Sequence, residues 1–234
     1  MHSGLNRQTP GSDATTLHLL HLAGNPKGRG LDIGCGQGRA SLLLAKSGIQ
    51  LTAIDTHQPY LDELNKKATS LGLGDFITTR NISMDKLDYP DESFGVVWSE
   101  GAAYVIGWEQ ALMSWKRLVK PGGVLVATEC CWLSESPSDV AVEFWGKNYP
   151  RMLTSRAAAD VATANGFEVI ATYTLPAGDW FDEYYNPIKK RHAMLSEGAD
   201  EDMKQAIASG RREIELYEKH GDEYDYVGFV LKNK

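Results

Sequence analysis

A short glycine-rich segment, LDIGCGQGRA at residues 31–40, constrains the fold of this chain more than any other stretch. Its first residues are apolar and read as the end of a β-strand. Three glycines, Gly34, Gly36 and Gly38, follow at every second position. Glycine permits backbone conformations and close approaches that other residues disfavour, and a glycine-rich turn between a strand and a helix is typical of nucleotide sites. The segment therefore predicts an α/β fold with a nucleotide-like ligand at this turn.

Predicted strands and helices alternate along the first 132 residues. Apolar strands are expected at 28–34, 49–55, 75–83, 94–101 and 124–132. Helices are expected at 12–24, 39–48, 58–72 and 107–123, the last with Leu112, Trp115, Leu118 and Val119 at helical spacing before Pro121. Such alternation is typical of a parallel sheet with helices on both faces.

The pattern changes after Trp132. Residues 133–155 and 176–222 do not continue the alternation, and we interpret them as insertions that cover one end of the sheet as a helical lid. The chain returns to strands at 166–175 and 225–233, which extend the same sheet. We therefore expect a single domain over residues 1–234.

Composition narrows the class of protein. The chain has 234 residues, 42% of them hydrophobic, and a formal net charge of −7. No apolar run approaches the ~18 residues of a membrane span, and the polar N-terminus does not read as a signal peptide. Net negative charge disfavours a nucleic-acid partner, which requires clustered Lys and Arg. The three cysteines form no disulfide framework, so we expect a cytoplasmic protein with no membrane contact.

Metal binding is not expected. The histidines are scattered without a convincing set of partner ligands, and Cys130 and Cys131 lie within a predicted buried strand.

Two carboxylates flank the glycine turn. A dinucleotide fingerprint would place its third glycine at position 39, where this chain has Arg39. Asp32, just before the turn, would repel a pyrophosphate and attract an ammonium group. Asp55, at the end of the second strand, is placed to accept the hydroxyls of a ribose. A ligand with ribose hydroxyls, an ammonium group and a nucleotide base fits the description of S-adenosylmethionine.

Asp55 and three longer segments follow one another in a recognisable order: LDIGCGQGRASLLLA, SMDKLDYPDESFGVVWSEGAAY and RLVKPGGVLVATE. They resemble the class I S-adenosylmethionine-dependent methyltransferases, particularly the UbiE-like group that acts on small molecules. The resemblance covers residues 30–130 and implies a Rossmann-like fold, with a seven-stranded, mostly parallel sheet and a final antiparallel strand. One departure is Gly95, where members of the family usually carry Asp.

The resemblance also implies which residues hold the methionine part of the cofactor. Asp32 and the backbone of Gly34 and Gly36 bind it. Cys35 and Gly38 belong to the same turn and are included among the cofactor-binding residues. We interpret Cys35 as a small packing residue of the turn rather than a nucleophile.

Residues after the next strands are implied to bind the rest of the cofactor. Asp55 binds the ribose with Thr56 beside it, and Ser83 and Met84 border the adenine. Ser99, after the fourth strand, faces the methyl group.

Glu100 and Tyr104 follow the fourth strand, whose carboxyl end faces the ligand in open α/β sheets. Glu100 is a candidate general base, but it is equally suited to hold the cofactor's ammonium group or to pair with an arginine. Tyr104 supplies a polar group at the same end. We name both as candidate catalytic residues, although alignment of the reactants alone can carry such a transfer.

Aromatic residues concentrate in the predicted lid. Their FW…YP and W…YY arrangement resembles a branch of small-molecule methyltransferases. Such rings form an apolar or cation-binding pocket, or they simply pack the lid. The candidate substrate-binding residues are Trp132, Trp145, Tyr149, Trp180, Tyr184 and Tyr185.

These observations predict an enzyme that transfers a methyl group from S-adenosylmethionine to a small-molecule acceptor by in-line displacement, releasing S-adenosylhomocysteine. Nucleic-acid amino-methylating enzymes resemble this fold but carry Asn/Asp-Pro-Pro-aromatic after strand four, where this chain has SEGAAY. Two alternatives stay open, a non-catalytic S-adenosylmethionine-binding protein and an NAD-dependent oxidoreductase. We expect a monomer or a homodimer.

Overall fold

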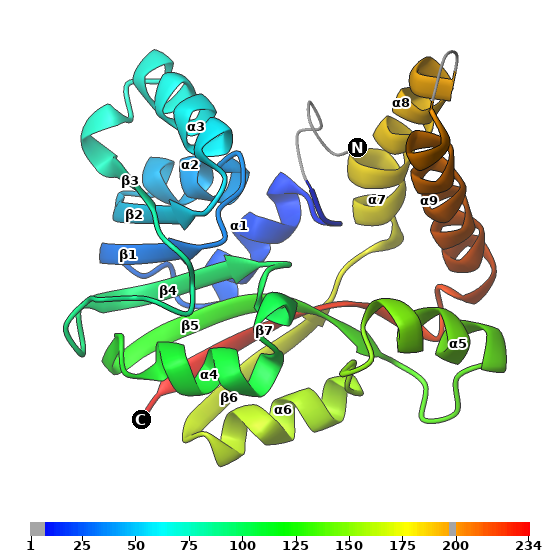
Figure 1. Ribbon diagram of the computed structural model, residues 1–234. Coiled ribbons are helices and arrows are strands. Elements are labelled where there is room, and N and C mark those ends of the chain that lie inside the picture. The colour runs from blue at the N-terminus through cyan, green and yellow to red at the C-terminus, as the bar shows by residue number, and fades with distance from the viewer. Residues whose placement is uncertain (1–7, 197–199) are drawn as a thin grey trace.

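One sheet of seven strands organises the computed structural model, which describes residues 8–196 and 200–234 (Figure 1). The strands are β1 (Gly28–Ile33), β2 (Ile49–Asp55), β3 (Ile77–Asn81), β4 (Phe94–Glu100), β5 (Val119–Trp132), β6 (Phe167–Thr174) and β7 (Tyr224–Asn233). Their order is β3-β2-β1-β4-β5-β7-β6. β7 runs antiparallel to both of its neighbours, β5 and β6, and the other pairs of neighbouring strands are parallel. The predicted seven-stranded, mostly parallel sheet with a final antiparallel strand is confirmed.

Helices cover both faces of the sheet (Figure 1). One face carries α1 (Asp13–Leu22), α2 (Arg39–Lys46) and α3 (Gln58–Ser70), and the other carries α4 (Trp108–Lys116) and α6 (Ser155–Ala164). Side chains alternate along β4, so that Trp98 packs with Leu19 and Leu44 on the first face, and Val97 packs with Trp115 on the second. Short 3₁₀ turns lie at Gly74–Phe76 (η1) and Ala103–Val105 (η2). Of the helices in the described residues, none combines the length and apolar character needed to cross a membrane.

The boundary between α4 and β5 differs from the prediction. The helix ends at Lys116 rather than continuing towards Pro121, and β5 begins at Val119. Val119 is fully buried and pairs with Phe94 of β4. Leu118 and Val119 both fit helical spacing and both are fully buried, but Leu118 lies in the turn after α4 and Val119 begins the strand. The expected helix over 107–123 is therefore wrong in its last turns.

The two segments expected to form a lid contain further helices at the carboxyl edge of the sheet. These are α5 (Asp139–Asn148), α7 (Ala177–Trp180), the π-helical turn η3 (Phe181–Tyr185), α8 (Asn186–Ser196) and α9 (Glu201–His220). We call these elements the lid. In Figure 1, α7, α8 and α9 stand together beside the sheet, and α5 lies beyond the end of β5. The lid has its own aromatic core, in which Trp180 stacks on Tyr217 with ring centroids 4.2 Å apart.

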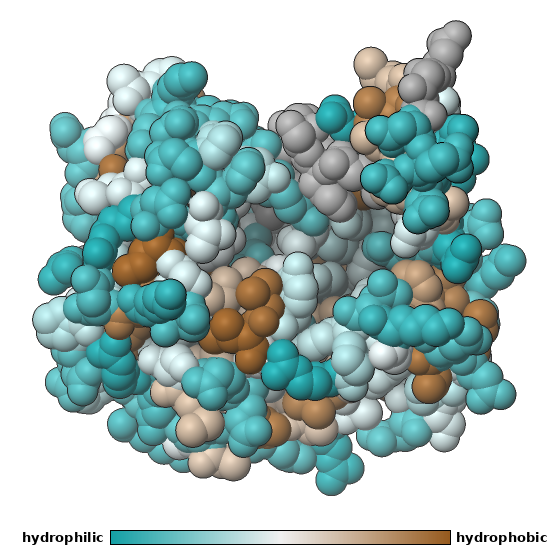
Figure 2. Space-filling model, in the orientation of Figure 1, coloured by the Kyte–Doolittle hydropathy of each residue, from teal (hydrophilic) through white to brown (hydrophobic). Residues whose placement is uncertain are grey.

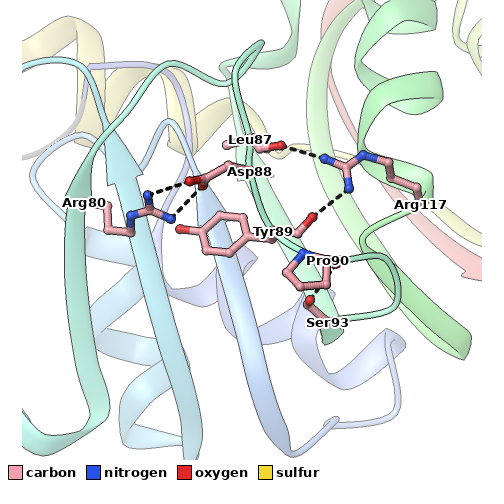
Figure 3. A network of polar contacts seen from close by, with 7 residues as sticks. All are labelled: Arg80, Leu87, Asp88, Tyr89, Pro90, Ser93 and Arg117. Atoms are coloured by element: carbon pink, nitrogen blue, oxygen red, sulfur yellow. Dashed lines mark hydrogen bonds and ion pairs between the residues drawn. The ribbon is translucent and has the colours of Figure 1, made fainter.

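Two arginines fix the long connection between β3 and β4 (Figure 3). Arg80 pairs with Asp88 at 3.0 Å, and Arg117 donates to the Leu87 carbonyl at 2.6 Å and to the Tyr89 carbonyl at 2.7 Å. Because these contacts hold the middle of the connection, its first residues, which follow β3, have a defined place at the edge of the sheet.

Candidate active site

Two adjoining cavities lie at the carboxyl ends of the parallel strands. The main cavity, about 460 Å³, lies between the ends of β1, β4 and β5 and the lid. The side cavity, about 260 Å³, lies beside the ends of β2 and β3. Gly34, Gly101 and Tyr104 line both. Figure 2 shows the surface hollowed between the lid and the side that carries α2 and α3. The strand order reverses between β1 and β4, and open α/β sheets bind ligands at such a point.

The glycine turn supplies the backbone wall that separates the cavities. Gly34 has φ +70° and Gly36 has φ +52°, a region that favours glycine. A Cβ on Gly34 would lie 2.5 Å from the Cβ of Ala102, so no side chain fits there. The Gly36 amide donates to Oδ2 of Asp55 at 2.9 Å. A hydrogen bond thus joins the turn after β1 to the acid that ends β2.

The other two residues of the turn lie in different environments. Gly38 lines neither cavity, and a Cβ there would lie 2.2 Å from Leu64 of α3, so this glycine permits helix packing. Cys35 is half-buried in the wall of the main cavity. Burial raises the pKa of its thiol well above the usual value, which keeps the sulfur protonated and a poor nucleophile.

Asp32, near the end of β1, lines the main cavity, and its side chain is almost fully buried. The Ser41 hydroxyl of α2 donates to its Oδ2 at 2.5 Å. Burial raises the pKa of Asp32 to about 7, against the lowering effect of Ser41, and the negative charges of Glu100 and Asp55 raise it further. A positive group bound here would stabilise the carboxylate, so the residue is suited to an ammonium group.

Asp55 ends β2 and lines the side cavity with Thr56, Ser83 and Met84. Its Oδ2 accepts from Gly36 and its Oδ1 accepts from the His57 amide at 2.8 Å. A carboxylate offers about four acceptor positions, so Asp55 can take ribose hydroxyls while it holds the turn. With Gly34, five of the predicted cofactor-binding residues therefore meet at this cavity.

Glu100 and Tyr104 lie where the two cavities approach each other. Oε1 of Glu100 accepts the Thr16 hydroxyl at 2.7 Å and the Trp98 indole N–H at 3.0 Å. Two donors on one oxygen orient the carboxylate. Tyr104, in η2, is 44% exposed, and its ring meets that of Tyr149 at 6.1 Å.

Four of the predicted substrate-binding aromatics line the main cavity from the lid: Trp145, Tyr149, Trp180 and Tyr184. They come from α5, from its C-terminal cap, from α7 and from η3. The Trp180 indole N–H donates to Asp225 at 2.5 Å, and this contact holds its ring in place.

Five predicted site residues line neither cavity: Gly36, Gly38, Ser99, Trp132 and Tyr185. Ser99 is fully buried, and its hydroxyl donates to the Ile33 carbonyl between β4 and β1 at 3.0 Å. Trp132 packs edge-on against Tyr224 in the lid core. Tyr185 lies behind the cavity wall, where its hydroxyl donates to Glu213 at 3.2 Å.

The main cavity also contains acids that the sequence analysis did not single out. Glu129 follows the last residue that β5 pairs with β4, and Glu213 comes from α9. In the sequence Glu129 lies inside the expected strand 124–132 rather than at its end, so the strand-end signal that pointed to Asp55 and Glu100 did not select it. Glu213 gave no such signal, because its helix reads as a polar surface helix. No group of three or more His, Cys, Asp or Glu side chains in the described residues is arranged to hold a metal ion.

These residues fit S-adenosylmethionine. The side cavity has an acid suited to a ribose, the main cavity has an acid suited to an ammonium group, and both are lined by Gly34, where no side chain fits.

Comparison with known proteins agrees with this fit. Residues 31–127 match the family model of a methyltransferase domain. The chain is 35% identical over 128 residues to the 2-methyl-6-phytyl-1,4-hydroquinone methyltransferase of Synechocystis sp., covering 53% of this chain and 38% of that protein. The chain spans about half or less of the length of the curated relatives it matches.

Solved structures share the whole fold. The S-adenosylmethionine-dependent methyltransferase of Geobacter sulfurreducens, in complex with S-adenosylhomocysteine, superposes with a TM-score of 0.80 at 22% identity, covering 100% of this chain and 96% of that one. The [4+2]-cyclase SpnF superposes with a TM-score of 0.77 at 21% identity, covering 98% and 85%. The predicted Rossmann-like fold is confirmed. Residues 31–127 of this chain match the methyltransferase-domain family, and the chain has the fold of solved S-adenosylmethionine-dependent methyltransferases.

Proposed function

We propose that the chain transfers the methyl group of S-adenosylmethionine to a small-molecule acceptor. The observation that carries the proposal is the pair of cavities that share Gly34, Gly101 and Tyr104. The sulfonium of this cofactor joins its ribose to its amino-acid part, so the shared residues border the reactive methyl group. The main cavity continues from there beneath the lid, where the acceptor binds.

The residues of the chain bind and orient, and the cofactor supplies the activated methyl group. Asp55 holds the ribose hydroxyls, Asp32 holds the ammonium group, and Ser83 and Met84 border the adenine. These contacts convert a bimolecular transfer into one between aligned partners. The lid encloses the acceptor and excludes water from the site.

Glu100 and Tyr104 complete the site beside the methyl group. The Glu100 carboxylate, held by two hydrogen-bond donors, places negative charge where positive charge must be stabilised. Tyr104 borders both cavities and offers a hydroxyl to the acceptor.

The proposal extends to the location, the partners and the oligomeric state of the chain. We propose a cytoplasmic location, which the free thiols of Cys35, Cys130 and Cys131 support. The formal charge of −7 supports action without a nucleic-acid or membrane partner. We propose that the chain acts as a monomer or homodimer.

Calorimetric titration with S-adenosylmethionine, S-adenosylhomocysteine and NAD tests the proposal. We expect the first two to bind and NAD not to bind. Asp55→Asn should lose at least tenfold in affinity for both ligands, because an amide no longer accepts two hydroxyls. The matched control is Asp75→Asn, at an exposed acid away from both cavities. Binding of NAD alone would support the oxidoreductase, and binding without turnover on any acceptor would support a non-catalytic protein.

A further inference from the structure

The part of the main cavity beneath the lid has a chemistry of its own. The strand register places Asp32 beside Trp98 and Trp98 beside Val126. Glu129 lies three residues beyond Val126 along β5, which is roughly 10 Å further at the rise of a strand. This inner part of the cavity therefore lies beyond the residues that fit the cofactor's ammonium group.

Glu129 is a buried carboxyl with unused hydrogen-bonding capacity. Its side chain lines the cavity although the residue is only 2% exposed. Oε1 accepts the Cys130 amide at 3.1 Å, whereas Oε2 is buried and receives no hydrogen bond of normal geometry from the described residues. Burial raises the pKa of Glu129 to about 8, although the Tyr149 hydroxyl and the Tyr104 main chain act to lower it. Such a group is costly to bury unless a partner arrives.

A second acid reaches the same cavity from α9. Burial raises the pKa of Glu213, while a hydrogen bond from Tyr185 acts in the opposite direction. With Asp32, Glu100 and Glu129, it brings the carboxyl groups of the cavity wall to four. Among the described residues of that wall, Arg39 is the only basic residue of the Lys or Arg type. Its Nε and Nη2 each donate to a carboxylate oxygen of Asp13 at 2.6 Å. The cavity therefore attracts positive charge.

Aromatic rings form a large part of the wall of the main cavity. These rings belong to Trp145, Tyr149, Trp180, Tyr184 and Tyr226. Burial raises the pKa values of the tyrosine hydroxyls, so the rings stay neutral. Rings of this kind bind ammonium groups through their faces. Acids and aromatic walls in one cavity select the same class of ligand.

We propose that the methyl acceptor is an amine, bound as its ammonium ion by Glu129 and Glu213 within the aromatic walls. This inference rests on the methyltransferase function proposed above. A neutral alcohol or phenol would leave the two acids without a counter-charge, and a carboxylate or phosphate acceptor would be repelled.

The acids also account for the proton that methylation must release. Glu129 takes a proton from the bound R–NH₃⁺ and leaves a neutral R–NH₂. The nitrogen lone pair then forms the N–C bond to the methyl carbon, as the C–S bond breaks and its electron pair returns to sulfur. The product leaves as R–NH₂⁺–CH₃, and Glu129 passes its proton to solvent. Two positive charges enter and two leave, one on the product and one as the proton.

Paired ligands test the amine preference directly. With the full chain saturated by S-adenosylhomocysteine, calorimetry compares benzylamine with benzyl alcohol and hexylamine with hexanol. We expect the amine of at least one pair to bind at least tenfold more tightly than its alcohol. Glu129→Gln should reduce this preference below threefold and leave the affinity for S-adenosylhomocysteine unchanged. The matched control is Glu168→Gln, an exposed acid of β6 that loses the same charge away from the cavity.

The possible outcomes separate the two proposals. If S-adenosylhomocysteine binds but neither pair shows a preference, the amine inference is overturned and the proposed function stands. A preference that survives in Glu129→Gln also overturns it, because Glu129 would then be a protonated structural residue. Glu213→Gln serves as a second variant if Glu129→Gln does not fold. If S-adenosylhomocysteine itself fails to bind the wild-type chain, both proposals fall.

Discussion

The hydroxyl of Thr16 donates a hydrogen bond of 2.7 Å to Oε1 of Glu100, and this contact joins helix α1 to the candidate active site. The preceding residue of the same helix makes a second connection, because the Thr15 hydroxyl donates to Asp179 of α7 at 2.6 Å within the protein interior. Helix α1 therefore ties the end of β4 to the lid. Its role is to hold both sides of the main cavity at a fixed separation.

Removing the Thr16 hydroxyl tests this connection. Thr16→Val keeps the β-branched shape and deletes a donor to a carboxylate, so we expect the free energy of unfolding to fall by about 1–3 kcal/mol. Urea denaturation measures the change. Thr16→Ser keeps the hydroxyl and should retain most of the stability. Equal losses in both variants would assign the effect to the methyl group rather than to the hydrogen bond.

The charge of Glu100 should distinguish the two forms of the cofactor. S-adenosylmethionine carries a sulfonium, whereas the sulfur of S-adenosylhomocysteine is neutral. Glu100→Gln keeps the shape of the side chain and removes its charge, so the affinity for S-adenosylmethionine should fall about fivefold to tenfold more than that for S-adenosylhomocysteine. Calorimetry with both ligands gives the ratio. An equal fall for both would place Glu100 away from the sulfonium.

Asp32 should make the ligand-free protein less stable at higher pH. Its pKa of about 7 in the folded chain lies above the unfolded value of 3.8, so its stabilising contribution is complete below pH 4 and is lost as the pH rises through 7. Asp32→Asn removes this dependence. We expect the variant to be more stable than the wild type at pH 8 by roughly 2–4 kcal/mol, and equal to it near pH 4.

Asp32→Asn should also weaken S-adenosylhomocysteine binding at pH 8 by at least tenfold, because the amide no longer balances the ammonium charge. Denaturation profiles across this pH range and calorimetry at pH 8 provide the two measurements. A variant that gains stability and keeps full affinity would show that Asp32 is a buried structural acid and not a ligand for the cofactor.

Much of the fold follows from local patterns that the sequence makes visible. The strands β1, β2 and β4 are largely apolar and end at a glycine or an acid, and the turn at Gly34 needs a conformation that glycine supplies. Asp32 and Asp55 could be predicted because their chemistry depends on position at a strand end. The end of α4 was mispredicted because the burial that fits Val119 to a helix face is equally satisfied in a sheet, where Val119 begins β5.

The substrate side could be predicted only in part, because it depends on tertiary contacts. Aromatic identity does not tell which ring faces the cavity, and Tyr185 proved to lie behind the wall while Tyr184 lines it. Glu213 reaches the cavity because α9 stands with α7 and α8 beside the carboxyl edge of the sheet. The hydrogen bond from Thr16 to Glu100 joins residues 84 positions apart, and no local sequence pattern predicts such a contact.

The glycine turn allows a matched pair of substitutions. Gly34 and Gly122 have nearly the same φ, +70° and +74°, but a Cβ on Gly122 meets open space while one on Gly34 meets Ala102 at 2.5 Å. Both Gly→Ala variants carry the backbone strain. Gly34→Ala should lose about 1–3 kcal/mol more of the free energy of unfolding and should not bind S-adenosylhomocysteine. Similar behaviour of the two variants in urea denaturation and calorimetry would contradict the close packing of the turn.

A crystal structure of the chain grown with S-adenosylhomocysteine is the most direct test of the account. We predict that one ligand molecule spans the two cavities, with its ribose hydroxyls on Asp55, its ammonium group near Asp32 and its sulfur beside Gly101 and Tyr104. The space next to Glu129 should then remain open for the acceptor. A ligand bound elsewhere, or one whose amino-acid part fills the space beside Glu129, would contradict the assignment of the two cavities.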